Sequence, residues 1–299
     1  MTADSRIALA LHGGAGARPG LDYSTEVEHM RGLVLQARVQ LLSGAPALDV
    51  AVATVEALES SGLYVAGRGA SPNLQGGYEL DACVMDGVGR RAGAVSALQG
   101  FKSPVHAAVL VMEQTPHVML TGGGAADFAH AQGLEPIEDA GQWFTQARSL
   151  PAQTSGLSHG TVGCVVRDQT GRLAAATSTG GVFGKLPGRV GDSPVPGAGA
   201  WADDTVAVSC TGQGEYFLRT AAAAQIAFRM RFGGQSVAEA SRAVLDEIEA
   251  MGGDGGLIAI DAAGRVTTPF NSAGMKRAIL YADGRIVSEV FAPDAPDLG

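Results

Sequence analysis

Four glycine-rich stretches in the second half of the chain carry residues that could do chemistry. They read HGTVGC at 159–164, TSTGG at 177–181, GRVGDSP at 188–194 and CTGQGE at 210–215. A threonine hydroxyl attacks a carbonyl only when a base takes its proton, and an α-amine, with an ordinary pKa of about 7.7 to 8.0, can be that base. Cleavage before Thr161 would place such an amine on the same residue as the hydroxyl. We therefore predict that Thr161 becomes a nucleophile once the Gly160–Thr161 bond is cut.

The sequence before Thr161 is typical of a processing site. Residues 133–160 contain Pro136, Gly141 and Pro151 and a Gln/Thr/Ser/Gly-rich run without sustained periodicity. A connection of this length is uncommon inside a compact domain. Glycine at position 160 lets the backbone adopt a strained geometry and leaves the carbonyl open to attack. We expect a flexible linker over about 133–160 that ends at the bond to be cut.

The elements that must position these residues alternate between helix and strand. Apolar runs and glycine, proline or serine boundaries predict strands at 7–11, 78–85, 92–98, 117–120, 161–167, 172–178 and 206–210, with three short strands closing the chain. Helices are expected at 24–43, 48–60, from the Ser103-Pro104 cap to about 113, after 122–124, at 215–231 and at 236–251. The pattern predicts a mixed α/β fold whose two halves are interleaved.

The four stretches also identify a family. Together with HGGAG at 12–16 and LDACVMDG at 80–87, they resemble the plant-type L-asparaginase and isoaspartyl aminopeptidase family, relatives of the glycosylasparaginases. The motifs occur in the family's order and span nearly the whole chain. The resemblance implies the four-layer αββα sandwich of the N-terminal-nucleophile hydrolases, in one catalytic domain over residues 1–299. It also implies autocatalytic cleavage into an α chain, 1–160, and a β chain, 161–299, which assemble as an (αβ)₂ heterotetramer.

By the same resemblance, the catalytic residues are Thr161, Thr179, Thr211 and Gly212. Thr161 attacks the carbonyl of Gly160, water hydrolyses the resulting ester, and Thr179 supports the nucleophile's hydroxyl. Thr211 and the amide of Gly212 stabilise the oxyanion. A hydroxyl beside a backbone N–H is an ordinary oxyanion hole, so the implied roles suit the residue types.

The resemblance assigns substrate binding to Arg189, Asp192, Thr211 and Gly212. Arg189 holds the substrate's α-carboxylate, which its planar fork matches, and Asp192 holds the α-ammonium. The implied substrates are small molecules or dipeptides: L-asparagine, hydrolysed to aspartate and ammonia, and peptides with an N-terminal isoaspartyl (β-aspartyl) residue. Preference between the two is left open, and glycosylasparaginase-like hydrolysis is an alternative.

No cofactor is expected for the chemistry, but the resemblance implies a structural sodium ion. Its main-chain ligands would come from Leu58, Glu59, Ser61, Tyr64, Ala66 and Arg68. In this loop Val65 stands where the family commonly has asparagine.

Composition excludes several classes of partner. The formal net charge of -9 and pI near 5.1 argue against sequence-independent binding to nucleic acid or an anionic membrane. The three cysteines are odd in number and lie in apolar runs, which suggests neither disulfides nor a metal site. The apolar run at 7–11 is too short for a signal peptide, and no stretch approaches membrane-spanning length, so we expect a cytoplasmic protein.

Two other readings of the motifs stay open. The stretch GLSHG at 156–160 matches the GxSxG nucleophile elbow of a serine esterase, but an elbow needs a strand before Ser158 and a helix after it. The stretch TGGG at 121–124 could open a nucleotide-binding helix, but the third glycine of a dinucleotide fingerprint and the lysine of a P-loop are missing.

Overall fold

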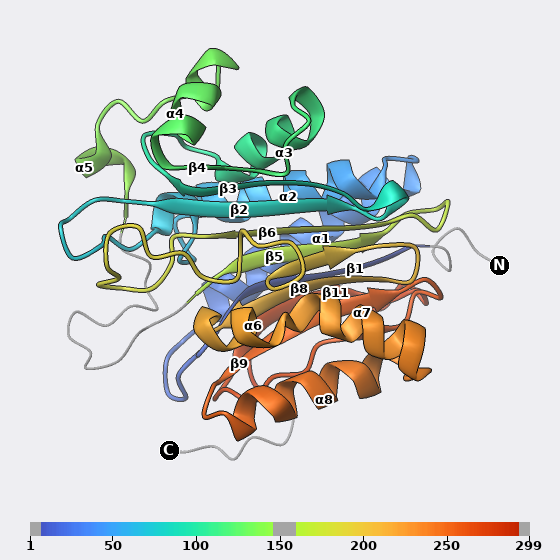
Figure 1. Cartoon of the computed structure of the whole chain (residues 1–299). Helices are drawn as coiled ribbons and strands as arrows, with labels where there is room; N and C mark the ends of the chain where they lie inside the picture. Colours follow the sequence, from blue (N-terminus) through green and yellow to red (C-terminus); the bar gives the residue numbers. More distant parts are fainter. Residues whose placement is uncertain (1–6, 146–159, 293–299) are drawn as a thin grey trace.

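The computed structural model describes residues 7–145 and 160–292, which form two β-sheets and the helices that cover them (Figure 1). The larger sheet has the order β12-β11-β1-β5-β6-β2-β3-β4, and the smaller one β10-β9-β8-β7. Neighbouring strands are antiparallel except for the parallel pair β3–β4. The strands are β1 Ala8–Ala15, β2 Leu80–Asp86, β3 Arg91–Leu98, β4 Met119–Thr121, β5 Val162–Arg167, β6 Leu173–Thr179, β7 Ala200–Ala202, β8 Val206–Gly212, β9 Gly255–Asp261, β10 Val266–Thr267, β11 Met275–Leu280 and β12 Ile286–Glu289.

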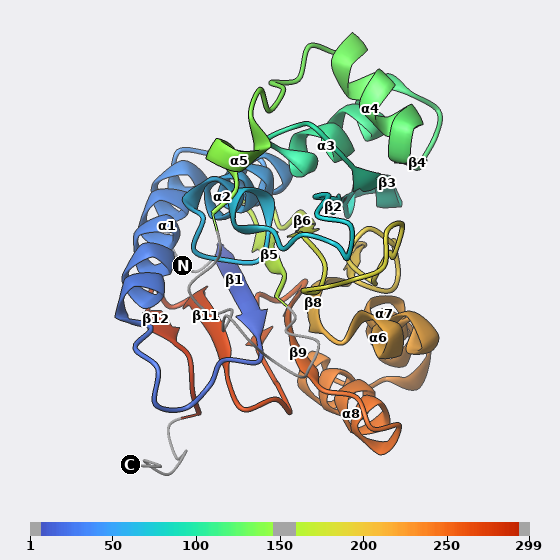
Figure 2. The same ribbon diagram turned by 90° about the vertical axis from the view of Figure 1, so that its left-hand side faces the viewer.

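The helices lie on the outer faces of the two sheets (Figures 1 and 2). They are α1 Ser24–Leu42, α2 Ala47–Ser61, α3 Pro104–Gln114, α4 Gly122–Ala131, α5 Ala140–Trp143, α6 Gly214–Thr220, α7 Ala222–Gly233 and α8 Val237–Ala250. Helices α1, α2 and α3 contact the larger sheet, and α7 and α8 contact the smaller one. The mixed α/β class predicted from the sequence is confirmed.

Three large clusters of buried side chains hold the described parts of the chain together, and the alternation of residues along the strands explains them. In β5, Cys164 and Val166 face the cluster beneath α1, α2 and α3, whereas Val165 between them faces the smaller sheet. A second cluster, rich in alanine, fills the space between the sheets. The third packs Val208 of β8 and its neighbours against α6, α7 and α8. Each sheet therefore buries both of its faces.

Several element boundaries differ from the sequence-based prediction. The helix expected at 215–231 is broken at Ala221, whose φ of 47° lies in the left-handed region and separates α6 from α7. β1 continues to Ala15 instead of ending at Leu11, so the first four residues of the HGGAG motif are part of a strand. The chain closes with four strands instead of three, and the short strand β7 was not predicted. Short strands and glycine-rich strand ends give weak periodic signals, which explains these errors.

The start of α3 shows how tertiary contacts replace a local cap. Pro104 occupies the first turn as predicted, but the hydroxyl of Ser103 does not bond to the helix backbone. It donates to Oε2 of Glu59 (2.9 Å), and Oε1 of Glu59 accepts the Val105 N–H (3.1 Å). A buried carboxylate from the end of α2 therefore caps α3.

The expected linker has structure at its beginning. α5 lies within residues 133–145, and Asp139 caps it by accepting from the Gly141 N–H at 2.8 Å. The ring of Phe144 then stacks on Tyr78, with centroids 3.7 Å apart. Residues 146–159 of the expected linker, and with them Ser158, lie outside the described residues. Within the described ranges, none of the helices combines the length and apolar character needed to cross a membrane.

Candidate active site

The β5–β6 hairpin brings Thr161 and Thr179 together. Thr161 directly precedes β5 and Thr179 is the last residue of β6, and the register pairs Val162 with Ser178. The turn between the strands is held by Asp168, whose Oδ1 accepts from the N–H groups of Thr170 (2.8 Å) and Arg172 (3.1 Å). Two predicted site residues thus become neighbours because one tight turn sets the register of one hairpin.

The hydroxyl of Thr179 is bound to the predicted cleavage site. Thr179 Oγ1 donates to the carbonyl oxygen of Gly160 at 2.7 Å and accepts the Gly181 N–H at 3.0 Å. A donor on this oxygen polarises the carbonyl and would stabilise the oxyanion formed when a nucleophile adds to it. Thr179 is buried in the uncut chain, so this hydrogen bond is shielded from water.

The side chain of Val65 explains why position 160 is glycine. A Cβ on Gly160 would lie 2.8 Å from both Cβ and Cγ2 of Val65, closer than real Cβ atoms pack. The φ of Gly160 lies outside the left-handed range, so the close approach, and not an unusual backbone angle, requires glycine here. The carbonyl of Val65 also accepts the Gly180 N–H at 2.9 Å, which ties this loop to the end of β6.

Ser193 lies in the GRVGDSP motif but was not predicted to be a site residue. Its Oγ lies 3.5 Å from Oγ1 of Thr161, and both residues are buried. A hydroxyl there could orient Thr161 in its predicted role as nucleophile, and catalytic hydrogen bonds are often long before substrate binds. The signal that could have found Ser193 is its place directly after Asp192, although serine in a Gly/Pro-framed loop is more often a turn residue.

His12 supports the main chain of Thr161 through a buried network. Its Nδ1 lies 3.1 Å from the carbonyl oxygen of Thr161, and its Nε2 lies 2.9 Å from Oγ of Ser209. Because a carbonyl only accepts, Nδ1 carries the proton and Nε2 accepts from Ser209. Burial lowers the pKa of His12 to about 3, so the ring is neutral at physiological pH. Gly163 leaves the room for this network, since a Cβ there would lie 2.0 Å from Ser209 Oγ.

Thr211 and Gly212 end β8 of the smaller sheet. The Oγ1 of Thr211 accepts the Ala15 N–H at 3.2 Å, which leaves its own proton free to point toward a ligand. Both residues are fully buried or nearly so. Since β5 and β8 are in contact, the end of β8 faces Thr161 across the two sheets.

Arg189 is held by a carboxylate in the uncut chain. Its Nε and Nη2 donate to the two oxygens of Glu215, each at 2.9 Å, a bidentate arrangement. The guanidinium packs over Gly191, where a Cβ would meet Nη1 at 2.9 Å. Asp192, three positions after Arg189, is 3% exposed. Glu215 was not predicted as a partner of Arg189. An acidic residue in the first turn of a helix is already favoured by the helix dipole, so its presence there indicated no further role.

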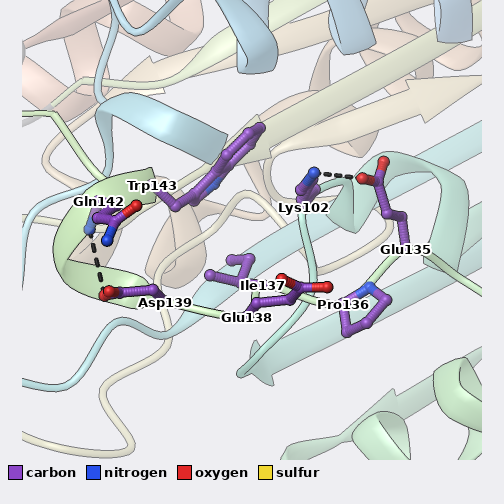
Figure 3. A pocket seen from close by; sticks show the side chains of 8 residues that line it. All are labelled: Lys102, Glu135, Pro136, Ile137, Glu138, Asp139, Gln142 and Trp143. Atoms are coloured by element: carbon purple, nitrogen blue, oxygen red, sulfur yellow. Dashed lines mark hydrogen bonds and ion pairs between the residues drawn. The ribbon is translucent and has the colours of Figure 1, made fainter.

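All of the predicted catalytic and substrate-binding residues except Thr211 line one small cavity of about 10 Å³. Its lining residues are Gly160, Thr161, Thr179, Gly181, Val182, Arg189, Gly191, Asp192, Ser193, Gly212 and Gly214. Thr211, the residue before Gly212, is not among them. Gly160 therefore forms part of the wall of the cavity that contains Thr161. A larger hollow beside α5, where Lys102 reaches toward Glu135 and Trp143, contains none of the predicted site residues (Figure 3).

The predicted sodium ligands lie at the end of α2 and in the loop after it. The last carbonyls of a helix lack intrahelical partners and carry its negative end, which suits a cation. Several of these oxygens accept one hydrogen bond each, for example Tyr64 from the Ala66 N–H (2.8 Å) and Arg68 from the Thr145 N–H (2.9 Å). A carbonyl has two lone pairs, so each could still bind an ion. Among the described residues, no group of His, Cys, Asp or Glu side chains offers an alternative metal site.

The esterase alternative lacks the required element after Ser158. A nucleophile elbow continues into a helix, whereas the chain continues into β5, which lies inside the larger sheet. The HGGAG motif, which could have formed an esterase oxyanion loop, instead packs against the backbone of Gly160 and Thr161 through Gly14.

Comparisons with known proteins agree with the motifs. The chain matches the asparaginase family model over residues 5–289. It is 47% identical over 302 residues to an isoaspartyl peptidase of Salmonella typhimurium, covering 93% of this chain and 96% of that protein. An isoaspartyl peptidase of Escherichia coli is 47% identical over 297 residues, covering 92% of each. A plant-type L-asparaginase of Pyrobaculum calidifontis is 40% identical over 287 residues, covering 90% and 95%. The chain therefore belongs to the asparaginase family.

Proposed function

We propose that this protein is a self-cleaving amidohydrolase whose nucleophile is Thr161. The observation that carries the proposal is the position of the Gly160 carbonyl, which accepts from Thr179 Oγ1 at 2.7 Å and belongs to the residue directly before Thr161. In the cleavage step Thr161 Oγ bonds to the carbonyl carbon, the C–N bond breaks, and the hydroxyl proton ends on the Thr161 nitrogen. Water then hydrolyses the ester, leaving an α chain 1–160 and a β chain 161–299.

Cleavage gives Thr161 the base that it needs for turnover. Its new α-amine takes the hydroxyl proton, the hydroxyl attacks the substrate amide, and an acyl-enzyme forms while the amine or ammonia leaves. Thr211 and the Gly212 amide stabilise the oxyanion, and water releases the product. Arg189 and Asp192, which line the same cavity, bind the α-carboxylate and α-ammonium of the substrate.

The proposed substrates are L-asparagine and peptides with an N-terminal isoaspartyl residue. Relatives at 47% identity are named isoaspartyl peptidases, and a mouse relative at 37% identity is named isoaspartyl peptidase/L-asparaginase. Both substrates present the same charged head group one methylene from the reacting carbonyl, which matches one site with one arginine and one acid. Glycosylasparaginase-like hydrolysis is the second candidate, since it needs the same head group.

Four further features belong to the same proposal. The three buried clusters support a four-layer αββα sandwich of the N-terminal-nucleophile type. The carbonyls of the loop from Leu58 to Arg68 would hold a structural sodium ion, which would stiffen the loop that carries Val65. The processed chains would form an (αβ)₂ assembly, whose mass size-exclusion chromatography with light scattering can test. The proposed location of this assembly is the cytoplasm.

The test of function is a direct assay on purified, processed protein. Ammonia release from L-asparagine and amine release from a β-aspartyl dipeptide are measured beside a matched α-aspartyl dipeptide. We expect hydrolysis of the first two and none of the third, because only they place the reacting carbonyl on the side chain of a free amino-acid head. Hydrolysis of glycosylasparagine alone would establish the second candidate instead.

A further inference from the structure

One loop connects two predicted site residues, and a buried lysine lies inside it. Thr179 precedes the loop of residues 180–188, and Arg189 follows it. Lys185, between them, is 2% exposed. Lysine is almost never fully buried unless it is paired, so the position of Lys185 calls for a partner and a role.

The partners of Lys185 come from the start of β2. Lys185 Nζ donates to the main-chain oxygen of Glu79 at 2.7 Å. Burial lowers the pKa of Lys185, while the charges of Asp81 and Glu79 favour its protonated form. Burial raises the pKa of Asp81 to about 6, and the charge of Lys185 opposes that rise. The charges of the Lys185 ammonium and the Asp81 carboxylate therefore partly offset each other in the protein interior.

Glu79 also fastens the far end of the loop. Its Oε1 accepts the Gly188 N–H at 2.8 Å, directly before Arg189. Its Oε2 accepts from Nδ2 of Asn73 at 3.0 Å, which fixes the orientation of the carboxylate. Glu79, the residue directly before β2, therefore binds Lys185 through its carbonyl and the backbone beside Arg189 through its side chain.

The near end of the loop rests on Lys185 itself. A Cβ on Gly181 would lie 2.7 Å from Cδ and 2.8 Å from Nζ of Lys185, so the lysine stem packs against the Gly181 backbone. The N–H of Gly181 donates to Oγ1 of Thr179. At one end of the loop, Lys185 therefore contacts Gly181, whose N–H orients Thr179. At the other end it is linked through Glu79 to Gly188, the residue before Arg189.

We propose that Lys185 is a positioning residue that sets the separation between the Thr179 hydroxyl and the Arg189 guanidinium. In the proposed reaction Thr179 supports the nucleophile and Arg189 binds the α-carboxylate, so their separation limits the distance between the reacting carbonyl and that carboxylate. Lys185 therefore determines specificity for a head group one methylene from the amide. Glutamine, which has one more methylene, is excluded by the fixed loop. This inference rests on the proposed function.

The variant Lys185→Met keeps the aliphatic stem and removes the ammonium. Removal of the ammonium alone would leave the buried Asp81 carboxylate without its counter-charge and could unfold the protein. The double variant Lys185→Met/Asp81→Asn removes both charges, so the test does not depend on the folding of the single variant. Lys102→Met is the matched control, because it removes one lysine charge at the hollow of Figure 3. Intact mass gives the processed fraction of each protein, so that kcat and KM refer to processed enzyme.

We expect KM for L-asparagine and for a β-aspartyl dipeptide to rise about tenfold in Lys185→Met and in the double variant, since small misplacements of binding groups have such effects. The preference for asparagine over glutamine in kcat/KM should fall in both, while kcat per processed enzyme stays near the wild-type value. Lys102→Met should match the wild type. A lower melting temperature with unchanged KM and unchanged preference in both variants would show a purely structural lysine and overturn the inference. Wild-type protein without activity on either substrate would instead overturn the proposed function.

Discussion

The backbone of Gly160 lies directly against the side chain of Val65, with no room for a Cβ between them. We therefore predict that Gly160→Ala displaces the bond to be cut and slows processing strongly, as followed by intact mass over time. The double variant Gly160→Ala/Val65→Gly removes the colliding carbons and should recover part of the rate. Equal processing rates of the two variants would show that the contact does not govern cleavage.

Thr179 gives the second prediction. Thr179→Val keeps the shape of the side chain but removes the donor to the Gly160 carbonyl, and loss of one such donor typically lowers a rate by about 10² to 10³. Processing of this variant should slow by that order. Thr54→Val, a buried threonine of α2 whose hydroxyl bonds to Val50, is the control and should process normally. A Thr179→Val protein that matures as fast as the control would remove Thr179 from the mechanism.

The pair Arg189–Glu215 leads to a graded effect on substrate binding. Glu215 is half exposed, and exposed ion pairs contribute about 0 to 1 kcal/mol, so Glu215→Gln should raise KM at most about fivefold. Arg189→Lys loses the fork and should raise KM on the order of tenfold to a hundredfold. Added salt should raise the wild-type KM toward that of Glu215→Gln. A lower KM in Glu215→Gln would instead mean that Glu215 competes with the substrate carboxylate.

Glu59 predicts a pH dependence of stability. Burial raises its pKa from the ordinary 4.5 to about 8. Between pH 4.5 and 8 the unfolded chain releases a proton that the folded chain keeps, so folding stability falls as pH rises, by up to about 1.4 kcal/mol per pH unit. Glu59→Gln cannot titrate, and its melting temperature relative to wild type should increase across this window. Glu28→Gln, at an exposed position of α1, should follow the wild-type curve, and a Glu59→Gln curve parallel to wild type would contradict the assignment.

The sequence was a good guide where a residue type is demanded by periodicity or by an ordered motif. The β5–β6 hairpin followed from two alternating runs around a turn, and the family resemblance from six motifs in order. Contacts between distant segments were beyond its reach. Glu59 capping α3, Glu215 holding Arg189 and Ser209 bonding His12 each join residues with no local signal, because their partners are brought near only by tertiary packing. Ala221 illustrates the same limit in the backbone, since a left-handed alanine has no sequence signature.

The central claim, that Thr161 cuts the chain before itself, is tested most directly by intact-mass and N-terminal analysis of freshly purified wild type beside Thr161→Ala. The account predicts two wild-type chains whose masses sum to the 30.3 kDa precursor plus one water, a new N-terminus at Thr161, and an uncut mutant. A wild type that stays whole after prolonged incubation, or a Thr161→Ala protein that is cut at the same bond, would contradict it.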